Sequence, residues 1–131
     1  MPTSPRLSSA AEGFLAENHL CTFTTLRPDG SPHVTPVRFT WDGEAGLARV
    51  MTAVTRRKAR NVLATPACRV SLCQTVGPRW ITLEGTAAVS DDPLRVKEGA
   101  RRYAKRYWSS PPEPPGLVVI EIEIDRVLGL L

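Results

Sequence analysis

The chain has 131 residues, enough for one domain with a real core but too few for two. Hydrophobic residues make up 42% and charged residues 23%, an ordinary globular mix, and no apolar run approaches the ~20 residues that a membrane helix needs. The N-terminus lacks the apolar stretch of a secretory signal, so the sequence predicts a cytoplasmic protein. The net charge is +4, and 14 of the 17 basic residues are arginine, which indicates a GC-rich genome at least as much as a polyanion partner.

The cysteines and histidines show no metal-binding pattern. Cys21, Cys68 and Cys73 are odd in number, none belongs to a CxxC pair, and all lie in strand-like runs, which predicts small buried hydrophobic residues. His19 and His33 have no ligand spacing to each other or to the cysteines. The sequence therefore predicts no structural metal.

The first half of the chain reads as a short helix followed by three strands. A capping box from Ser9 to Glu12 begins the helix, which is predicted over residues 8–18. Alternating polarity and β-branched residues predict strands, and turn sequences such as Pro28-Asp29-Gly30-Ser31 separate them. The expected strands cover residues 20–26, 33–41 and 47–54 and form a meander.

The second half adds a hairpin, a helix and a final strand. Residues 68–74 and 79–89 are predicted to pair across the turn Val76-Gly77-Pro78. Asp91-Asp92-Pro93 begins a helix, whose apolar face is predicted to pack on the core and consists of Val96, Ala100, Tyr103 and Tyr107. After a proline-rich loop, residues 117–124 alternate as a strand. Six strands with short hairpins predict one small, mainly β domain over residues 1–131, an antiparallel barrel with flanking helices.

The segment from Thr55 to Asn61 carries four basic residues in five and lies between a strand and a helix. Thr55 is predicted as the N-cap, with Arg56, Arg57 and Lys58 in the first turn. Cations there oppose the helix dipole, which places roughly +0.5 of charge at this end. The pattern therefore favours a bound anion, most simply a phosphate, over a solvated basic turn, which stays as the alternative.

Common catalytic motifs are missing from the chain. There is no GxSxG, HExxH, P-loop or GxGxxG sequence, so neither a serine triad nor Rossmann-type nucleotide binding is supported. Pro36 cannot donate to a β-ladder, so its strand is expected to be an edge or bulged. Trp41, Trp80 and Trp108 are candidates to stack on a ring system, with core packing the competing interpretation, favoured for Trp41 and Trp108.

Three motifs together resemble a known family. They are the turn and strand Asp29-Gly-Ser-Pro-His-Val34, the basic Lys58-x-x-Asn61 helix start and the strand Arg79-Trp-x-x-Leu-Glu-Gly-x-Ala87. Their order resembles the pyridoxamine-phosphate-oxidase-like split β-barrels over about residues 7–129, and more narrowly the actinobacterial branch that uses the deazaflavin coenzyme F-420. Within that branch the chain is most similar to the biliverdin reductases. The arginine- and histidine-bearing C-terminal segment of true pyridoxamine-phosphate oxidases is not matched, which argues against vitamin B6 oxidation.

The resemblance implies a cofactor site at an interface between the subunits of a homodimer. The cofactor phosphate would be held by Lys58 and Arg57, with Thr52 or Thr55. The deazaflavin ring would be lined by His33, Val34, Thr35, Pro36, Met51, Thr52 and Ala53. Gln74, Gly77 and Trp80 would close the site from the partner subunit. Arg56 and Arg60 would be available to the glutamyl tail of the coenzyme.

The resemblance also implies the reaction. Reduced F-420 would transfer a hydride to a conjugated acceptor such as biliverdin, whose propionates would meet Arg38, Arg49 or Arg79. No side chain is required as acid or base, and no catalytic residue is predicted. The alternatives are an FMN-binding oxidoreductase of the same fold and a non-enzymatic F-420 or flavin carrier. A nucleic-acid module is disfavoured because no aromatic residue is interleaved with the basic ones at 55–61.

Overall fold

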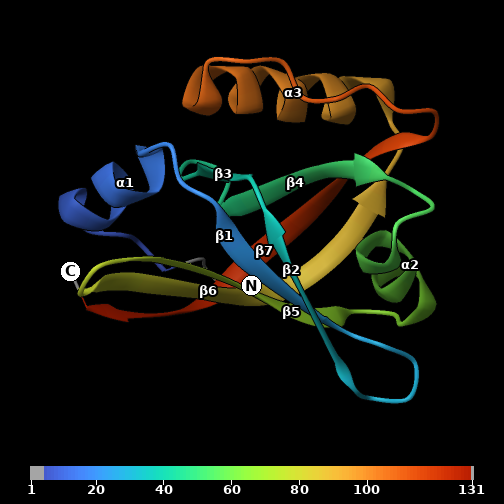
Figure 1. Ribbon diagram of the computed structural model, residues 1–131, viewed down its shortest axis with the longest axis horizontal. Helices are drawn as coiled ribbons and strands as arrows, with labels where there is room; N and C mark the ends of the chain where they lie inside the picture. The colour runs from blue at the N-terminus through green and yellow to red at the C-terminus, as the bar shows by residue number, and fades with distance from the viewer. Residues whose placement is uncertain (1–4, 131) are drawn as a thin grey trace.

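The computed structural model describes residues 5–130, in which one antiparallel sheet of seven strands curls around a core (Figure 1). Two of the three helices contribute residues to this core. The elements in chain order are α1 (Ser9–Ala16), β1 (Cys21–Leu26), β2 (Pro32–Val37), β3 (Phe39–Asp42), β4 (Leu47–Ala53), α2 (Arg57–Ala64), β5 (Cys68–Val76), β6 (Arg79–Ser90), α3 (Pro93–Tyr107) and β7 (Leu117–Leu130). Among these residues no helix is both long and apolar enough to cross a bilayer.

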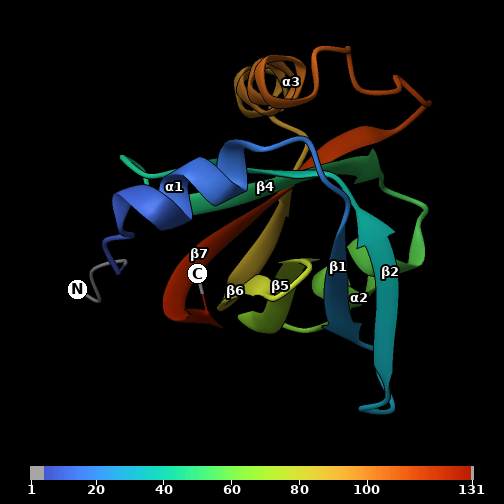
Figure 2. The same cartoon turned by 60° about the vertical axis from the view of Figure 1, so that its left-hand side comes forward.

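The two edges of the sheet are formed by consecutive strands. The spatial order is β2-β1-β5-β6-β7-β4-β3, and Arg38 alone separates β2 from β3. The single strand expected over 33–41 is therefore two strands, and the expected count of six becomes seven. The chain leaves β1 at Val37 and pairs with β4 from Phe39 onward, which curls the sheet toward closure (Figure 2). Pro36 lies on edge strand β2, as its missing N–H predicted.

The last strand is longer than its alternation predicted. β7 pairs with both β4 and β6 and runs to Leu130, well beyond the expected end at Ile124. The pairing of β6 with β7 shifts register between Glu84 and Gly85, and such a β-bulge bends the strands locally. A Cβ on Gly85 would lie 2.0 Å from the carbonyl oxygen of Glu123, so only glycine permits this close approach.

The core lies inside the curled sheet and contains Phe23, Phe39, Leu72 and Leu83. Of the cysteines, Cys21 and Cys68 are buried as predicted, whereas Cys73 is half-buried. Trp41 is partly buried against the core. The expectation that Trp108 packs in the core was wrong: it caps the C-terminus of α3 with φ 55° and is 85% exposed.

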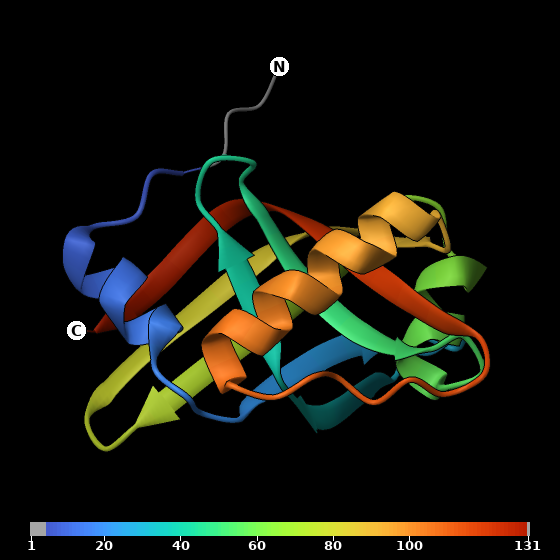
Figure 3. The same cartoon turned by 90° about the horizontal axis from the view of Figure 1, so that it is seen from above.

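The N-termini of α1 and α3 are each set by a capping residue. The N-cap of α1 is Ser8, one residue before the predicted capping box, and its hydroxyl accepts from the Ala11 N–H over 3.1 Å. Asp92 is the N-cap of α3, as predicted, and the helix buries Tyr103 and Tyr107. Figure 3 shows α3 lying across β4 and β7, with its C-terminal end beside α1.

Candidate functional site

Helix α2 presents cations at its N-terminus. Its N-cap is Arg56, not Thr55 as predicted, and no side chain of residues 5–130 caps the free N–H groups there. The Arg56 N–H donates to the Ala53 carbonyl over 3.0 Å, so the chain turns directly from β4 into the helix. No acidic residue occupies the first turn. The site is therefore a helix N-terminus with unsatisfied donors and surplus positive charge.

The position of α2 is set by buried contacts with the sheet. Ala59, Asn61 and Val62 form its buried face. The Asn61 amide donates to the Thr25 hydroxyl over 2.9 Å, which attaches the helix to β1. Thr25 pairs with His33 across β1 and β2, and cross-strand partners share a face of the sheet. The histidine therefore lies on the side of the sheet that carries α2.

His33 lies in a strongly positive field. Burial lowers its pKa first, and the charges of Arg27, Lys58 and Arg57 lower it further. Burial also lowers the pKa of Lys58, with a contribution from Arg56. Within residues 5–130 no ion pair neutralises Arg56, Arg57 or Lys58, whereas the charge of Arg27 acts on the nearby Asp29 carboxylate. The cluster consequently favours an anionic ligand.

A buried polar atom at the same place lacks a partner. The Nδ1 atom of His33 is buried and has no hydrogen-bond partner among the described residues. Buried polar groups are nearly always satisfied in folded proteins, so an unpaired ring nitrogen next to uncompensated cations suits a site that is completed by a ligand. These residues fit a bound phosphate.

The remaining predicted cofactor residues divide into two groups. His33 to Pro36 on β2 and Met51 to Ala53 at the end of β4 lie at the α2 end of the molecule (Figures 1 and 2). Val34 and Pro36 are exposed, whereas Thr52 and Ala53 are buried. Gly77 and Trp80 form the β5–β6 hairpin at the opposite end, near the C-terminus of the chain (Figures 1 and 3). One chain does not bring the two groups together.

Gln74 has a structural role instead of the predicted ligand contact. Its side chain is fully buried, at 0% exposure. Its amide donates to the Phe14 carbonyl over 2.8 Å, and its oxygen accepts from Arg106 over 2.6 Å. The Cys21 thiol also points at that oxygen over 3.4 Å. Because every polar atom of Gln74 is used and none is exposed, we remove it from the candidate site.

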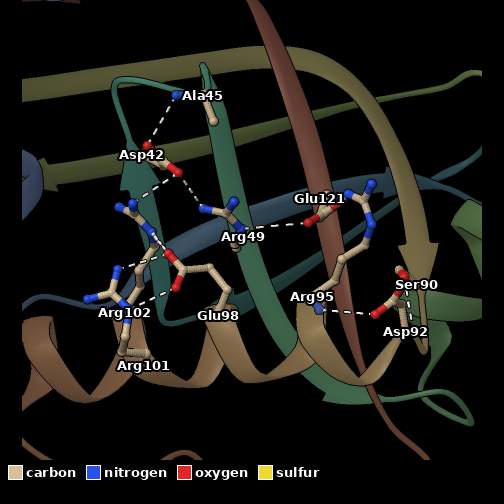
Figure 4. Close-up of polar contacts among 10 residues, drawn as sticks. All are labelled: Asp42, Ala45, Arg49, Ser90, Asp92, Arg95, Glu98, Arg101, Arg102 and Glu121. Carbon is tan, nitrogen blue, oxygen red and sulfur yellow. Dashed lines mark hydrogen bonds and ion pairs between the residues drawn. The ribbon is translucent and has the colours of Figure 1, made fainter.

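The three arginines predicted to meet a substrate lie in different surroundings. Arg49 is 7% exposed and is neutralised by Asp42 at 2.9 Å and Glu121 at 3.7 Å (Figure 4), so we correct that prediction. Arg79 is part-exposed and pairs with Glu17 over 3.0 Å. Arg38 is exposed, donates to the Tyr103 hydroxyl over 3.1 Å and has no carboxylate partner in the described part of the chain.

Sequence reasoning missed Arg27 and Arg106. Arg27 precedes the Pro-Asp-Gly turn and contributes to the field at His33. The sequence signal for Arg27 was that it and His33 flank the same predicted hairpin turn. Arg106 is buried at the end of α3, where its guanidinium donates to the Glu17 and Phe39 carbonyls and to Gln74. Nothing in the residue pattern distinguishes Arg106 from its solvated neighbours.

The fold and this site define a class of protein. A curled antiparallel sheet whose two edges are consecutive strands, with a helix of cationic N-terminus after β4, is a split β-barrel of the flavin-binding type. The chain matches the family model of pyridoxamine 5'-phosphate oxidase over residues 7–130, and it belongs to that family.

One relative and two solved structures show what this chain is similar to. Over 127 residues, 97% of this chain and 90% of the relative, the chain is 47% identical to an F-420H2-dependent biliverdin reductase of Mycobacterium tuberculosis (strain CDC 1551 / Oshkosh). A solved F-420 reductase is 26% identical with a TM-score of 0.72, covering 93% of this chain and 98% of that one. The structure of Rv2991, a conserved hypothetical protein of Mycobacterium tuberculosis, has a TM-score of 0.78 at 22% identity, covering 94% and 84%, and supports the fold alone.

Proposed function

We propose that this chain is a cytoplasmic reductase that uses coenzyme F-420, with biliverdin as the first acceptor to test. The observation that carries the proposal is the cation cluster at the start of α2, which surrounds His33 and has no carboxylate partner among the described residues. The 47% identity to an F-420H2-dependent biliverdin reductase supports this choice of coenzyme and acceptor.

In this proposal the phosphate of the coenzyme binds at the N-terminus of α2. Lys58 and Arg57 would supply charge, the free N–H groups of the first turn would supply donors, and the unpaired Nδ1 atom of His33 would form another hydrogen bond. Of the two threonines, Thr55 is exposed and Thr52 is buried, which favours Thr55 as the hydroxyl that reaches the phosphate.

In this proposal the deazaflavin ring lies against the exposed edge of β2 and the end of β4. His33 to Pro36 and Met51 to Ala53 would orient the ring through backbone groups and apolar contact. Reduced deazaflavin would supply the hydride, and the chain would hold the ring in a fixed orientation and exclude water from one side of it. Exposed Val34 offers apolar surface for this purpose, whereas the Met51 side chain packs against Gly99 of α3, so Met51 would contribute its backbone groups.

The site is completed by a second copy of the chain in this proposal. Gly77 and Trp80 lie at the end opposite α2, so they reach a cofactor bound there only from a partner subunit. Trp80 is 36% exposed and lies near exposed Leu128 and Leu130, its neighbours on β7. An exposed apolar surface of this kind suits an interface between subunits. Arg38 and Arg79 remain the candidates for the propionates of the acceptor.

Titration with F-420 and, separately, with FMN tests the coenzyme. We expect saturable binding of F-420, followed by the loss of reduced F-420 absorbance only when biliverdin is added. Preferential binding of FMN would favour the FMN-dependent alternative, and tight F-420 binding without turnover of any acceptor would favour a carrier. Light scattering of the same samples should give the mass of a dimer, and a monomer that binds and turns over would contradict the shared site.

A further inference from the structure

Apart from the candidate site, a cavity of about 270 Å³ lies where α1, β3 and α3 meet. Its apolar wall is formed by Leu15 and Ala16 of α1 and by the Trp41 ring of β3. None of its lining residues is among those assigned to the cofactor. A volume just below the ~300 Å³ at which ligand pockets begin suits a molecule with one small ring system.

A buried hydroxyl in this cavity lacks a partner. Thr40 lines the cavity and is 5% exposed, and its Oγ1 atom is buried without a hydrogen-bond partner among the described residues. A buried hydroxyl left unpaired opposes folding, so a ligand oxygen at this position would remove a cost that the free protein bears.

The cavity also carries uncompensated positive charge. Its basic lining residues are Arg102, Lys105 and Arg106. Glu98 and Asp42 balance Arg102, at 2.7 and 3.1 Å. Lys105, in contrast, has no ion pair or hydrogen bond within the described residues.

Arg106 adds to this surplus because all of its hydrogen-bond acceptors are uncharged oxygens. One carboxylate faces the same space: Glu12 accepts from the Trp41 indole N–H over 3.1 Å. The Glu17 carboxylate also acts on Arg106, but it is paired with Arg79. Lys105 and Arg106 therefore face a single lining carboxylate, and the balance favours an anion.

We propose that this cavity binds a small aromatic carboxylate. The ring lies on Leu15 and the face of Trp41, while the carboxylate accepts hydrogen bonds from the Lys105 ammonium and the Thr40 hydroxyl. An apolar wall with a few convergent donors is the usual composition of a small-molecule site. This inference does not depend on the proposed coenzyme.

Benzoate is the probe that tests the site, with benzyl alcohol as its uncharged counterpart. The indole N–H resonances of the three tryptophans report position, because only Trp41 lines the cavity while Trp80 and Trp108 lie elsewhere. We expect benzoate to shift the Trp41 resonance saturably and benzyl alcohol to bind at least tenfold more weakly. Absence of a saturable shift at Trp41, or equal binding of the two probes, would overturn the proposal.

Matched variants separate this site from the phosphate site. Lys105→Ala should weaken benzoate about tenfold, whereas Lys97→Ala, at another exposed position on α3, should leave it unchanged. Thr40→Val should weaken benzoate several-fold while the Tm stays level or rises, because an unpaired hydroxyl has been removed. If Lys105→Ala behaves like Lys97→Ala, or if Lys58→Ala is the change that abolishes benzoate binding, the site is not at α1–β3–α3.

Discussion

The amide of Asn61 donates to the hydroxyl of Thr25 over 2.9 Å, and both side chains are shielded from solvent. This bond connects the middle of α2 to β1, at the strand position that pairs with His33. This buried contact therefore helps to fix the cationic helix relative to the pair of strands that carries the histidine.

Replacing that contact should destabilise the protein. Asn61→Ala leaves the Thr25 hydroxyl buried without its donor, and we expect a loss of about 1–3 kcal/mol in the free energy of unfolding. Urea denaturation measures it. Arg60→Ala, at the exposed neighbouring position, should change stability by less than about 0.5 kcal/mol. Equal effects of the two variants would show that the buried bond contributes nothing special.

Lys58 should contribute to coenzyme binding rather than to stability. Lys58→Ala removes a charged donor from the proposed phosphate position and should weaken F-420 by about 1–2 kcal/mol, roughly 5- to 30-fold. Fluorescence titration of the coenzyme gives the dissociation constant. Lys97→Ala is the matched lysine control, since it lies exposed on α3. Unchanged affinity in Lys58→Ala would contradict the phosphate site.

Gly99 should not tolerate a side chain. A Cβ there would lie 2.5 Å from the Met51 sulfur and 3.1 Å from Val119 Cγ2, so Gly99→Ala forces either the Met51 side chain or α3 to shift and crowds the buried Val119. We expect destabilisation of about 1 kcal/mol or more, despite the gain in helix propensity. Gly13→Ala in α1 is the control, because nothing lies within 4 Å of its Cβ position and the same substitution should stabilise. Thermal unfolding should therefore move in opposite directions for the two variants.

Glu98 should give a pH-dependent contribution to stability. Hydrogen bonds from Arg101 and Arg102 lower its pKa to about 2 from an ordinary value of 4.5. Because the folded state holds the carboxyl at the lower pKa, the stabilisation is present above pH 4.5 and is lost as the pH falls through about 2. The Tm difference between the native chain and Glu98→Gln should shrink from pH 7 to pH 2. A difference independent of pH would show that the ion pairs do not stabilise the fold.

Much of the fold was predictable because local signals and tertiary structure agree. The Pro-Asp-Gly turn, the Val-Gly-Pro hairpin and the Asp92 cap each lie where the residues indicated. Pro36 was correctly placed on an edge because a missing N–H is a local property. The division at Arg38 was not predictable, since it depends on which strand pairs with which once the sheet curls.

The candidate site was predictable to the extent that it consists of consecutive residues. The cationic start of α2 is visible in the sequence because positive charge at a helix N-terminus is unfavourable by itself. The buried roles of Gln74 and Arg49 were not visible, because their partners are distant in sequence and were fixed only by folding. Trp108 misled for the opposite reason: its size suggested burial, but the end of α3 leaves it in solvent.

Arg38 alone connects β2 and β3, the strands at the two edges of the sheet, so detaching one edge strand disturbs the other. Releasing residues 32–42 would uncover the outer backbone groups of β1 and β4 at the same time. Exposed strand edges are templates for pairing with other chains. A circular permutant opened at Arg38 should therefore be more prone to aggregate than one opened in the proline-rich 111–116 loop, where no strand edge depends on the connection.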